Sequence, residues 1–349
     1  MPSFSGSSLV PSLGLDTQPS LLRTSLRSLR ESFRTAVDEA SRGVFIDLSR
    51  DFRRSVFLAG DGRSGTTWLS EILNCDNRYR YLFEPFHPSF VPLVKHFRFF
   101  QYLRPDNQDE SFLKPARRIV TGAYRSTRVD SLNKRCIATR RLIKDIFSNL
   151  FLKWLQVRFP EMPIILVVRH PCAVAASKMK LKEWIWSVNP RDFLDQPELM
   201  ADYFEPFRGL IEETTDEFGK QILHWCLTHY VPFEQFRRGE LHVVAYEHLC
   251  ENREQEIRRL FAHVGREFDP KALEASSKPS ATITQDSAVV RKVDLVSGWL
   301  DKISPEQRRR ACEIMEAFGL KLYADDPMPL VDNLESCLQP ALDCNHVRE

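Results

Sequence analysis

Short apolar runs alternate with longer amphipathic stretches through the middle of the chain. The runs are rich in branched and aromatic residues and lie at 55–59, 141–146, 163–168 and 241–246. Each precedes a stretch with apolar positions at helical spacing, at 66–75, 147–158, 171–182 and 247–264. Apolar runs without polar alternation are typical of strands buried on both faces. The pattern therefore predicts a three-layer α/β fold in which helices flank a central parallel sheet.

The regions outside these units differ from them in composition. Residues 1–20 are rich in Ser, Pro and Gly and are expected to be disordered, whereas helical spacing predicts a helix over 21–42. Two insertions with helical patterns, 86–130 and 183–238, are rich in aromatic residues. Because extra loops and helices at the carboxyl end of such a sheet usually hold the substrate, we expect these insertions to form the substrate pocket. The predicted regions are an N-terminal tail with a helix, a main domain and a C-terminal tail, at 1–50, 51–324 and 325–349.

Composition places the chain among ordinary globular proteins. Of its 349 residues, 43% are hydrophobic and 28% are charged, and the net charge is +2. This charge is too small for a general nucleic-acid binder, so no nucleic-acid partner is expected. The longest apolar run, 163–168, is far shorter than the roughly 20 residues of a membrane span, so no transmembrane segment is expected.

The cysteines give information about compartment and metal binding. Eight are present, without a C-x-x-C pair or a dense framework, which favours a reducing compartment. No repeated zinc-type spacing occurs, so no metal is expected. Four cysteines lie in apolar periodic segments and are predicted to be buried thiols: Cys172, Cys226, Cys250 and Cys312. These features predict a cytoplasmic protein, and the serine-rich N-terminus with Arg23, Arg27 and Arg30 leaves an organelle transit peptide as the alternative.

A glycine-rich segment follows the first apolar run and leads into a helix. It reads Gly60-Asp-Gly-Arg-Ser-Gly-Thr-Thr-Trp-Leu69, and its three glycines are expected to take positive φ and approach a ligand. The free N–H groups at the helix start, from Gly65 to Thr67, favour an anion. A nucleotide triphosphate loop reads G-x-x-x-x-G-K-[ST], but here Thr66 replaces the lysine and Arg63 is the loop's cation. The segment predicts a P-loop-like phosphate site that does not serve the γ-phosphate of ATP.

A second candidate anion site follows the run at 163–168. Arg169 stands at the carboxyl end of this predicted strand, Pro171 opens the next helix, and Ser177 lies on its second turn. An arginine fork and a serine hydroxyl could face one anionic group from two sides. Taken alone, the two residues fit a surface arginine and a helix serine equally well. Beside the glycine-rich segment, they predict a second phosphate site distinct from the first.

A candidate general base lies in the segment Tyr81-Leu-Phe-Glu-Pro-Phe-His87. Glu84 is a carboxylate between apolar residues, and burial would raise its pKa toward the working pH. A capping or salt-bridged glutamate is the alternative. His87 is the rival base, and packing into the core is its other expected role.

Together these segments resemble the sulfotransferase family, whose members use 3′-phosphoadenosine 5′-phosphosulfate (PAPS). The resemblance covers residues 53–320. The family loop x-x-[RK]-S-G-T-T-[WF]-L matches Gly62–Leu69, and its strand-end arginine with a serine eight residues later matches Arg169 and Ser177. Residues 244–249, with a helix ending at 261–265, look like the family's Y-E-D-L strand and L-F-x-F-L-G helix.

The resemblance implies a sulfuryl transfer from PAPS, as co-substrate, to an acceptor hydroxyl or amine, with Glu84 as base and without a metal. Arg169 and Ser177 would bind the 3′-phosphate. Lys144 is expected either beside the sulfuryl group or in a salt bridge. The loop residues implied to bind the 5′-phosphosulfate side of PAPS are Gly62, Arg63, Ser64, Gly65, Thr66, Thr67 and Trp68, the last either against the adenine or in the core.

The C-terminal match is less regular. Family members carry R-K-G-x-x-G-D-W, whereas this chain has Arg291-Lys-Val-Asp-Leu-Val-Ser-Gly-Trp299, which lacks the first glycine and is one residue longer. The resemblance therefore only weakly implies Arg291 as a further 3′-phosphate ligand. Trp299 fits the core equally well.

The arginine in the loop and the Tyr-Leu-Phe-Glu-Pro segment are more similar to carbohydrate-type and bacterial sulfotransferases. This likeness implies a glycan or glycolipid acceptor, although the aromatic insertions suit lipids and phenols as well. Two other classes stay open. A small-molecule kinase would need a lysine at position 66 and Mg²⁺, and a non-catalytic nucleotide-binding scaffold would keep the fold but lose Arg63 or Glu84. The sequence gives no indication of oligomeric state.

Overall fold

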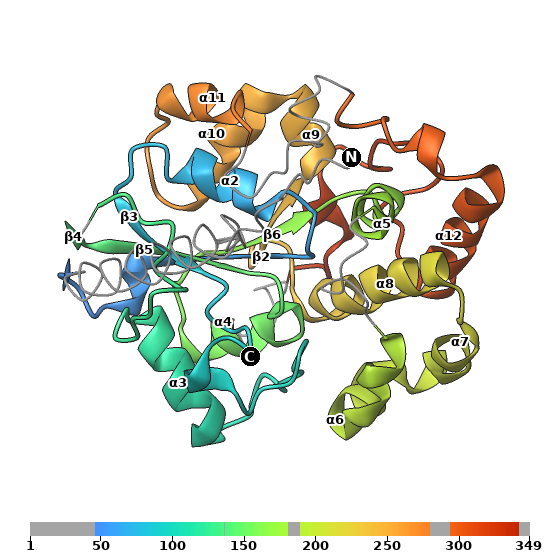
Figure 1. Cartoon of the computed structure of the whole chain (residues 1–349), viewed down its shortest axis with the longest axis horizontal. Helices are drawn as coiled ribbons and strands as arrows, with labels where there is room; N and C mark the ends of the chain where they lie inside the picture. Colours follow the sequence, from blue (N-terminus) through green and yellow to red (C-terminus); the bar gives the residue numbers. More distant parts are fainter. Residues whose placement is uncertain (1–45, 136, 181–188, 280–293, 342–349) are drawn as a thin grey trace, which may run out of the picture. The chain divides into compact units, whose positions relative to one another are not determined.

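The computed structural model describes residues 46–135, 137–180, 189–279 and 294–341 (Figure 1). The chain divides into two compact units, residues 1–44 and 45–349. The first unit, with the helix predicted over 21–42 and the transit-peptide alternative, lies outside the described residues. Everything below concerns the second unit.

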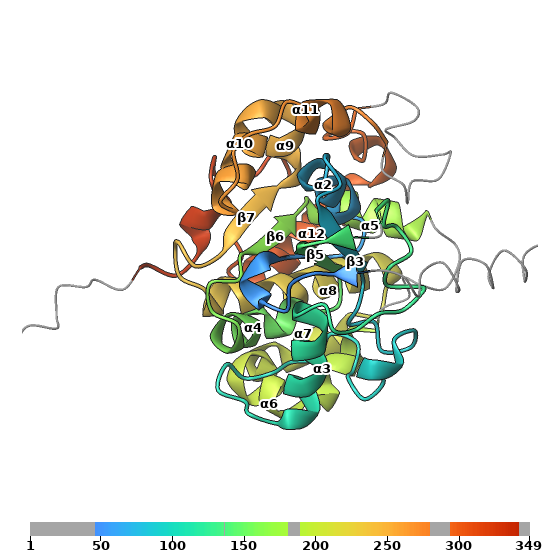
Figure 2. The same cartoon turned by 90° about the vertical axis from the view of Figure 1, so that its left-hand side faces the viewer.

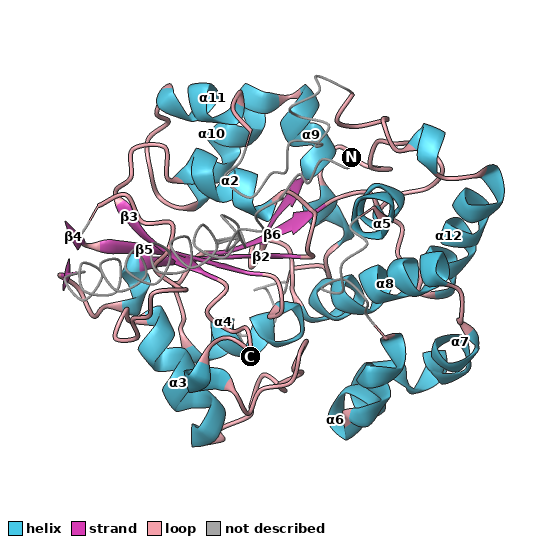
Figure 3. Ribbon diagram, in the orientation of Figure 1, coloured by secondary structure: helices cyan, strands magenta, loops and turns pink. Residues whose placement is uncertain are grey.

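Five parallel strands form the central sheet, in the order β3-β5-β2-β6-β7 (Figure 3). Two further short strands, β1 and β4, pair in parallel beside it. The strands are β1 (Ile46–Asp47), β2 (Ser55–Gly60), β3 (Tyr79–Phe83), β4 (Ile137–Ala138), β5 (Arg140–Asp145), β6 (Ile164–Val168) and β7 (His242–Ala245). The predicted α/β fold with a central parallel sheet is confirmed.

Helices cover both faces of the sheet (Figures 1 and 2). One layer contains α2 (Thr66–Leu73), α9 (Tyr246–Glu251), α10 (Arg253–His263) and α11 (Lys271–Ser276). The opposite layer contains α3 (Glu110–Val120), α4 (Leu152–Arg158), α5 (Pro171–Met179), α8 (Glu217–Gln235) and α12 (Pro305–Ala317). Two shorter helices, α6 (Pro197–Leu199) and α7 (Arg208–Glu213), lie in the second insertion. The remaining short helical segments are Phe52–Arg54, Pro92–Val94, Asn149–Phe151, Pro190–Asp195, Met200–Phe204, Glu205–Phe207, Leu300–Lys302 and Leu334–Cys337.

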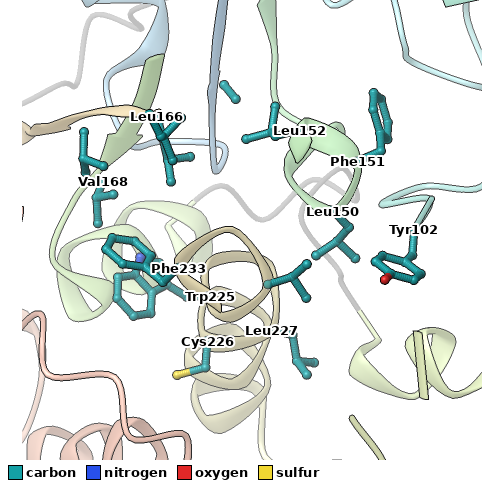
Figure 4. Close-up of a cluster of buried hydrophobic side chains, with 14 of the residues drawn as sticks. Tyr102, Leu150, Phe151, Leu152, Leu166, Val168, Trp225, Cys226, Leu227 and Phe233 are labelled. Carbon is teal, nitrogen blue, oxygen red and sulfur yellow. The ribbon is translucent and has the colours of Figure 1, made fainter. Parts of the chain in front are cut away.

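The central strand β2 shows why its sequence is apolar throughout. Val56 and Leu58 pack into the cluster under α2, whereas Phe57 and Ala59 pack into the cluster on the opposite face. Since successive side chains of a strand point to opposite faces, a sheet covered on both sides needs apolar residues at every position. Figure 4 shows the larger cluster, in which Trp225 and Phe233 of α8 lie close to Leu166 and Val168 of β6.

A buried charged cluster joins the strands at their amino ends. Arg80 binds both carboxylate oxygens of Asp130, at 2.8 and 2.9 Å, and lies 3.4 Å from Asp47. Arg141 of β5 donates to the other oxygen of Asp47 at 2.8 Å. Because both arginine side chains are fully buried, their charges depend on these carboxylates. The cluster explains why β3 was missed: an arginine at the second position of Tyr79–Phe83 is not expected in a buried strand.

Arg80→Met is expected to lower the free energy of unfolding by about 3–5 kcal/mol, because it leaves buried Asp130 without its cation. Urea unfolding followed by circular dichroism measures the change. Arg309→Met, on α12 with a side chain 74% exposed, is the control and is expected to change stability by less than about 0.5 kcal/mol. Equal stabilities of the two variants would contradict a structural role for the cluster.

The packed part of the chain extends beyond the predicted domain ends at 51 and 324. Asp47 is buried in the cluster just described, and Leu334 and Leu338 are buried at the other end. Of the predicted buried thiols, Cys172 and Cys226 are buried, whereas Cys250 and Cys312 are half-buried because each lies on the partly exposed side of its helix. Within the described ranges, no helix is long and apolar enough to cross a membrane, and no group of three or more His, Cys, Asp or Glu side chains is placed to hold a metal ion.

Candidate active site

The predicted site residues converge because they follow neighbouring parallel strands. Glu84 comes directly after β3, Lys144 ends β5, the glycine-rich segment follows β2, Arg169 follows β6 and Tyr246 follows β7. The carboxyl ends of parallel strands meet at one edge of the sheet, which is where open α/β folds bind ligands. The sequence analysis expected the substrate pocket at this edge, although it did not predict β3.

The loop between β2 and α2 is shaped by two glycines and one strained arginine. A Cβ on Gly60 would lie 2.7 Å from the Val167 carbonyl oxygen, so this glycine allows close approach of β6. Gly65 has φ +91°, and a Cβ there would lie 2.6 Å from the Tyr246 ring. Arg63 is the other residue of the loop with a left-handed backbone, at φ 73°. The expectation that all three glycines take positive φ is therefore wrong: in this loop it is Gly65 and Arg63 that do so.

The start of α2 carries unpaired polar groups. Gly65 is its N-cap and provides no side-chain hydrogen bond to the first N–H groups of the helix. The Ser64 hydroxyl oxygen is fully buried and has no hydrogen-bond partner among the described residues. Thr66 and Thr67 are buried beside it. Because buried polar groups are normally paired, this loop fits an anionic ligand group such as a phosphate.

The two predicted anion sites are joined in the structure. Arg63 Nε donates a hydrogen bond of 3.0 Å to Ser177 Oγ on α5. Arg169 Nη1 donates to the Arg63 carbonyl oxygen at 3.1 Å. The two predicted phosphate sites are therefore neighbours, and Arg63 connects the loop to α5.

Two cations lie together in this site without a carboxylate. Within the described part of the chain, neither Arg63 nor Arg169 forms a salt bridge, and Arg169 Nε is buried without a hydrogen-bond partner. Burial, followed by the nearby charge of Arg169, lowers the pKa of Arg63. Like charges held close in a half-buried position favour binding of an anion that neutralises them.

Arg169 is held in place by aromatic side chains and, through the next residue, by a buried glutamate. Its guanidinium lies 4.1 Å from the centre of the Tyr246 ring, and its carbonyl oxygen accepts a 3.0 Å hydrogen bond from Trp225 Nε1. The next backbone N–H, of His170, donates to buried Glu247 at 2.9 Å. Tyr246 and Glu247 belong to the Tyr-Glu-His-Leu match, so the motif orients the strand-end arginine.

The tryptophans of the site region belong to the core. Trp68 Nε1 donates to the Ser276 carbonyl oxygen at 3.2 Å, and its ring packs 5.5 Å from that of Tyr246. Trp299 is buried and stacks on His170, with ring centres 4.3 Å apart. Arg291 lies outside the described residues.

Glu84 forms the centre of a second charged group, at the end of β3. Its two carboxylate oxygens accept hydrogen bonds from Lys144 Nζ at 2.7 Å and from Arg128 at 3.2 Å. Its backbone is left-handed, with φ 47°, a conformation that costs a non-glycine residue of order 1 kcal/mol or more. Lys144 thus forms the salt bridge expected as one of its two roles. Arg128 was missed because nothing in its local sequence distinguishes it from the surface arginines nearby.

The expected rise in the pKa of Glu84 is wrong. Burial does raise the pKa of this carboxyl, but the adjacent ammonium of Lys144 and the guanidinium of Arg128 outweigh burial and lower it. Glu84 is therefore ionised at neutral pH. A carboxylate held between two cations is ready to accept a proton, although with low intrinsic basicity.

His87 packs among phenylalanine rings. Its ring centre lies 4.3 Å from that of Phe90, 5.3 Å from Phe99 and 4.7 Å from Phe147. Burial, with a contribution from the charge of Arg128, lowers its pKa to about 4, so the imidazole is neutral at pH 7. Phe90 and Phe99 are 53% and 46% exposed. His87 therefore lies beneath an exposed aromatic surface.

Asp145 anchors the segment that carries Glu84 and His87. Its fully buried carboxyl accepts backbone hydrogen bonds of 2.8 Å from Phe86 and from Phe147. Burial raises its pKa to about 7. Its position at the end of a predicted strand was the only sequence signal for this role.

Stability is expected to fall as the pH decreases from about 6.5 to about 4, by at least about 2 kcal/mol in total. Burial lowers the pKa of four histidines to about 4 in the folded chain: His87, His170, His229 and His263. The unfolded chain therefore takes up these protons first as the pH falls, which favours unfolding. Asp145 and Glu247, with raised pKa values, act in the opposite direction but are fewer. Urea unfolding near neutral pH and near pH 5 measures the change, and equal stability at both would contradict it.

A sequence model of the sulfotransferase family matches residues 55–270. The match covers more than half of the chain and includes the loop, Glu84, Arg169 and Ser177. The chain belongs to the sulfotransferase family and is an enzyme of that family. Among curated proteins, none matches the sequence significantly.

Solved structures of sulfotransferases are similar in part to this chain. The sulfotransferase domain of the Synechococcus PCC 7002 olefin synthase has 16% identity and a TM-score of 0.44, over 76% of this chain and 94% of that one. Mouse sulfotransferase SULT7A1, complexed with PAP, has 15% identity and a TM-score of 0.39, over 80% and 88%. Sulfotransferase STF1 from Mycobacterium tuberculosis H37Rv has 13% identity and a TM-score of 0.41, over 76% of both chains.

Proposed function

We propose that the protein transfers the sulfuryl group of PAPS to a hydroxyl or amine of an acceptor molecule. One observation supports this most strongly: Arg63 and Arg169 lie together without a carboxylate partner among the described residues, beside the unpaired hydroxyl of Ser64. A ligand with a phosphate at each end of its ribose would neutralise both cations. ATP offers nothing to the second arginine.

In the proposed mechanism, this chain's residues hold the nucleotide by charge and backbone donors. Arg169 and Ser177 would bind the 3′-phosphate, and the N–H groups from Gly65 to Thr67 would face the 5′-phosphosulfate. PAPS, when bound, supplies the sulfuryl group and a phosphate leaving group. Arg63, which already donates to Ser177, would offset the charge that develops as this group leaves.

Glu84 is the proposed general base because it is ionised and stands at the same sheet edge as the loop. Its carboxylate would accept the acceptor proton, while Lys144 and Arg128 keep it deprotonated and oriented. Once Glu84 has taken up the proton, it would attract Lys144 less strongly. The ammonium of Lys144 would then face the transferred group. His87, neutral and with its Nδ1 unpaired within the described ranges, is the second candidate base.

For the acceptor, we propose a hydroxyl carried by a molecule with an apolar part, such as a glycolipid. The exposed rings of Phe90 and Phe99 and the guanidinium of Arg128, 4.8 Å above Phe90, support this class. The carbohydrate-type motif of the loop supports a sugar hydroxyl as the site of sulfation. Both features fit an acceptor with a sugar and a lipid portion.

The test has two parts. Isothermal titration of the purified protein with PAP, the product nucleotide, is expected to show one site, and ATP with Mg²⁺ is expected to bind far more weakly. An acceptor screen with sulfur-labelled PAPS, sorted into glycans, glycolipids and phenols, then identifies the class that takes up label. Tight ATP binding without PAP binding would overturn the proposal in favour of a kinase, and PAP binding without label in any acceptor class would favour a non-catalytic scaffold.

A further inference from the structure

A buried ion pair connects the loop between β2 and α2 to helix α5. Both carboxylate oxygens of Asp61 accept hydrogen bonds from Lys178 Nζ, at 2.8 and 2.7 Å. The two side chains are only 2% and 1% exposed. His224 of α8 approaches the same carboxylate at 3.8 Å. Neither the loop pattern shared with the family nor the proposed mechanism uses this pair.

The pair and the Arg63–Ser177 hydrogen bond together form a clasp between the loop and α5. Ser177 and Lys178 are consecutive residues of α5, and they contact Arg63 and Asp61, which are two residues apart in the loop. The loop is thus fastened at two points on either side of Gly62. At the second of these points and shortly after it, the backbone takes the left-handed conformations of Arg63 and Gly65.

We infer that Asp61 and Lys178 are positioning residues, which hold the loop so that Arg63 and the N–H groups of α2 face the nucleotide. The inference rests on the proposed function, since it assigns the pair a role in binding PAPS. Neither Asp61 nor Lys178 is proposed to contact the nucleotide. Each acts through a nearby residue: Lys178 through the adjacent Ser177, and Asp61 through the strained Arg63 two residues later.

The charges around the loop support a role for the Asp61–Lys178 pair beyond filling space. An arginine pair is already present in this site, and a third cation without a partner would repel both. Asp61 neutralises Lys178, so the side chain can fasten the loop from within the protein without adding to the repulsion. A pair of apolar side chains would fill the same space. It would not fix the direction of the loop, because it lacks the two hydrogen bonds that the Lys178 ammonium donates to the Asp61 carboxylate.

The test is a double substitution, Asp61→Asn with Lys178→Met, which removes both charges and leaves neither unpaired. Hydrogen exchange at the amides of residues 62–67 is expected to be at least about tenfold faster. Isothermal titration is expected to show PAP affinity reduced by at least about tenfold, because part of the binding energy must then order the loop. Asp61→Asn with Lys178→Gln, which also removes both charges but keeps two groups able to hydrogen-bond, is the second variant if the first is poorly folded.

The matched control is Arg80→Met with Asp130→Asn, which neutralises a buried ion pair at the opposite edge of the sheet. It is expected to leave both loop exchange and PAP affinity as in the unmodified protein. If the Asp61 variants exchange and bind PAP like this control, the positioning role is overturned while the proposed function stands. If the unmodified protein itself does not bind PAP, both the proposed function and the positioning role are overturned. Faster loop exchange in the Asp61 variants would then show only that the pair stabilises the loop.

Discussion

Arg63→Ala is expected to abolish sulfuryl transfer while leaving the protein folded. The variant removes the hydrogen bond to Ser177 and the only cation of the loop. Removing one donor from a charge-stabilising site typically costs about 100- to 1,000-fold in turnover. We expect kcat/KM to fall at least about 100-fold, measured as transfer of labelled sulfate from PAPS to the acceptor found in the screen.

Folding should survive this change because Arg63 has no carboxylate partner in the described part of the chain. Its loss therefore leaves no buried acid unpaired, and it removes the repulsion between Arg63 and Arg169. Arg309→Ala, an exposed arginine on α12, is the control for general loss of positive charge. Activity near that of the control would show that Arg63 has no part in the reaction.

Glu84→Gln is expected to lower kcat by about 100- to 10,000-fold, the usual contribution of a general base. PAP affinity should be nearly unchanged, because Glu84 contacts Lys144 and Arg128 rather than the loop. The amide oxygen still accepts a hydrogen bond from Lys144, so the loss of stability is limited to about 1–3 kcal/mol. Single-turnover kinetics and PAP titration separate the two effects.

His87→Gln is the matched comparison for Glu84→Gln, because it changes the rival base on the same segment. If Glu84 is the base, His87→Gln retains most of its turnover. A large loss in His87→Gln with normal turnover in Glu84→Gln would transfer the role to the histidine. A collapse of PAP affinity in Glu84→Gln would instead make Glu84 part of the nucleotide site.

Most of the sheet could be predicted from the sequence, because strands that are buried on both faces consist of apolar residues. Four strands appeared as apolar runs, since β2 alternates between two covered faces and needs apolar residues on both. β3 was missed because Arg80 interrupts it, and only tertiary pairing with Asp130 makes that arginine acceptable in a strand. A charge satisfied by a residue 50 positions away leaves no local signal.

The positions of the candidate site residues could be predicted from spacing, but the electrostatics around them could not. Glycines at loop positions and an arginine at a strand end are local features, so the sequence could indicate them. The lowered pKa of Glu84 depends on Lys144 of β5 and on Arg128, which lies 44 residues further along the chain. The Asp61–Lys178 pair joins two motifs that are more than 100 residues apart. The sequence therefore indicates candidate ligand-binding groups more readily than the distant residues that contact those groups.

The left-handed backbone of Arg63 has a consequence for protein engineering. Glycine would fit this conformation without strain, and its introduction would also remove a cation crowded against Arg169. Selection for heat resistance alone would therefore favour Arg63→Gly and enrich inactive enzymes. Activity and stability are therefore expected to make opposing demands on this position. Screens for robust variants of this enzyme need to score sulfate transfer at every round.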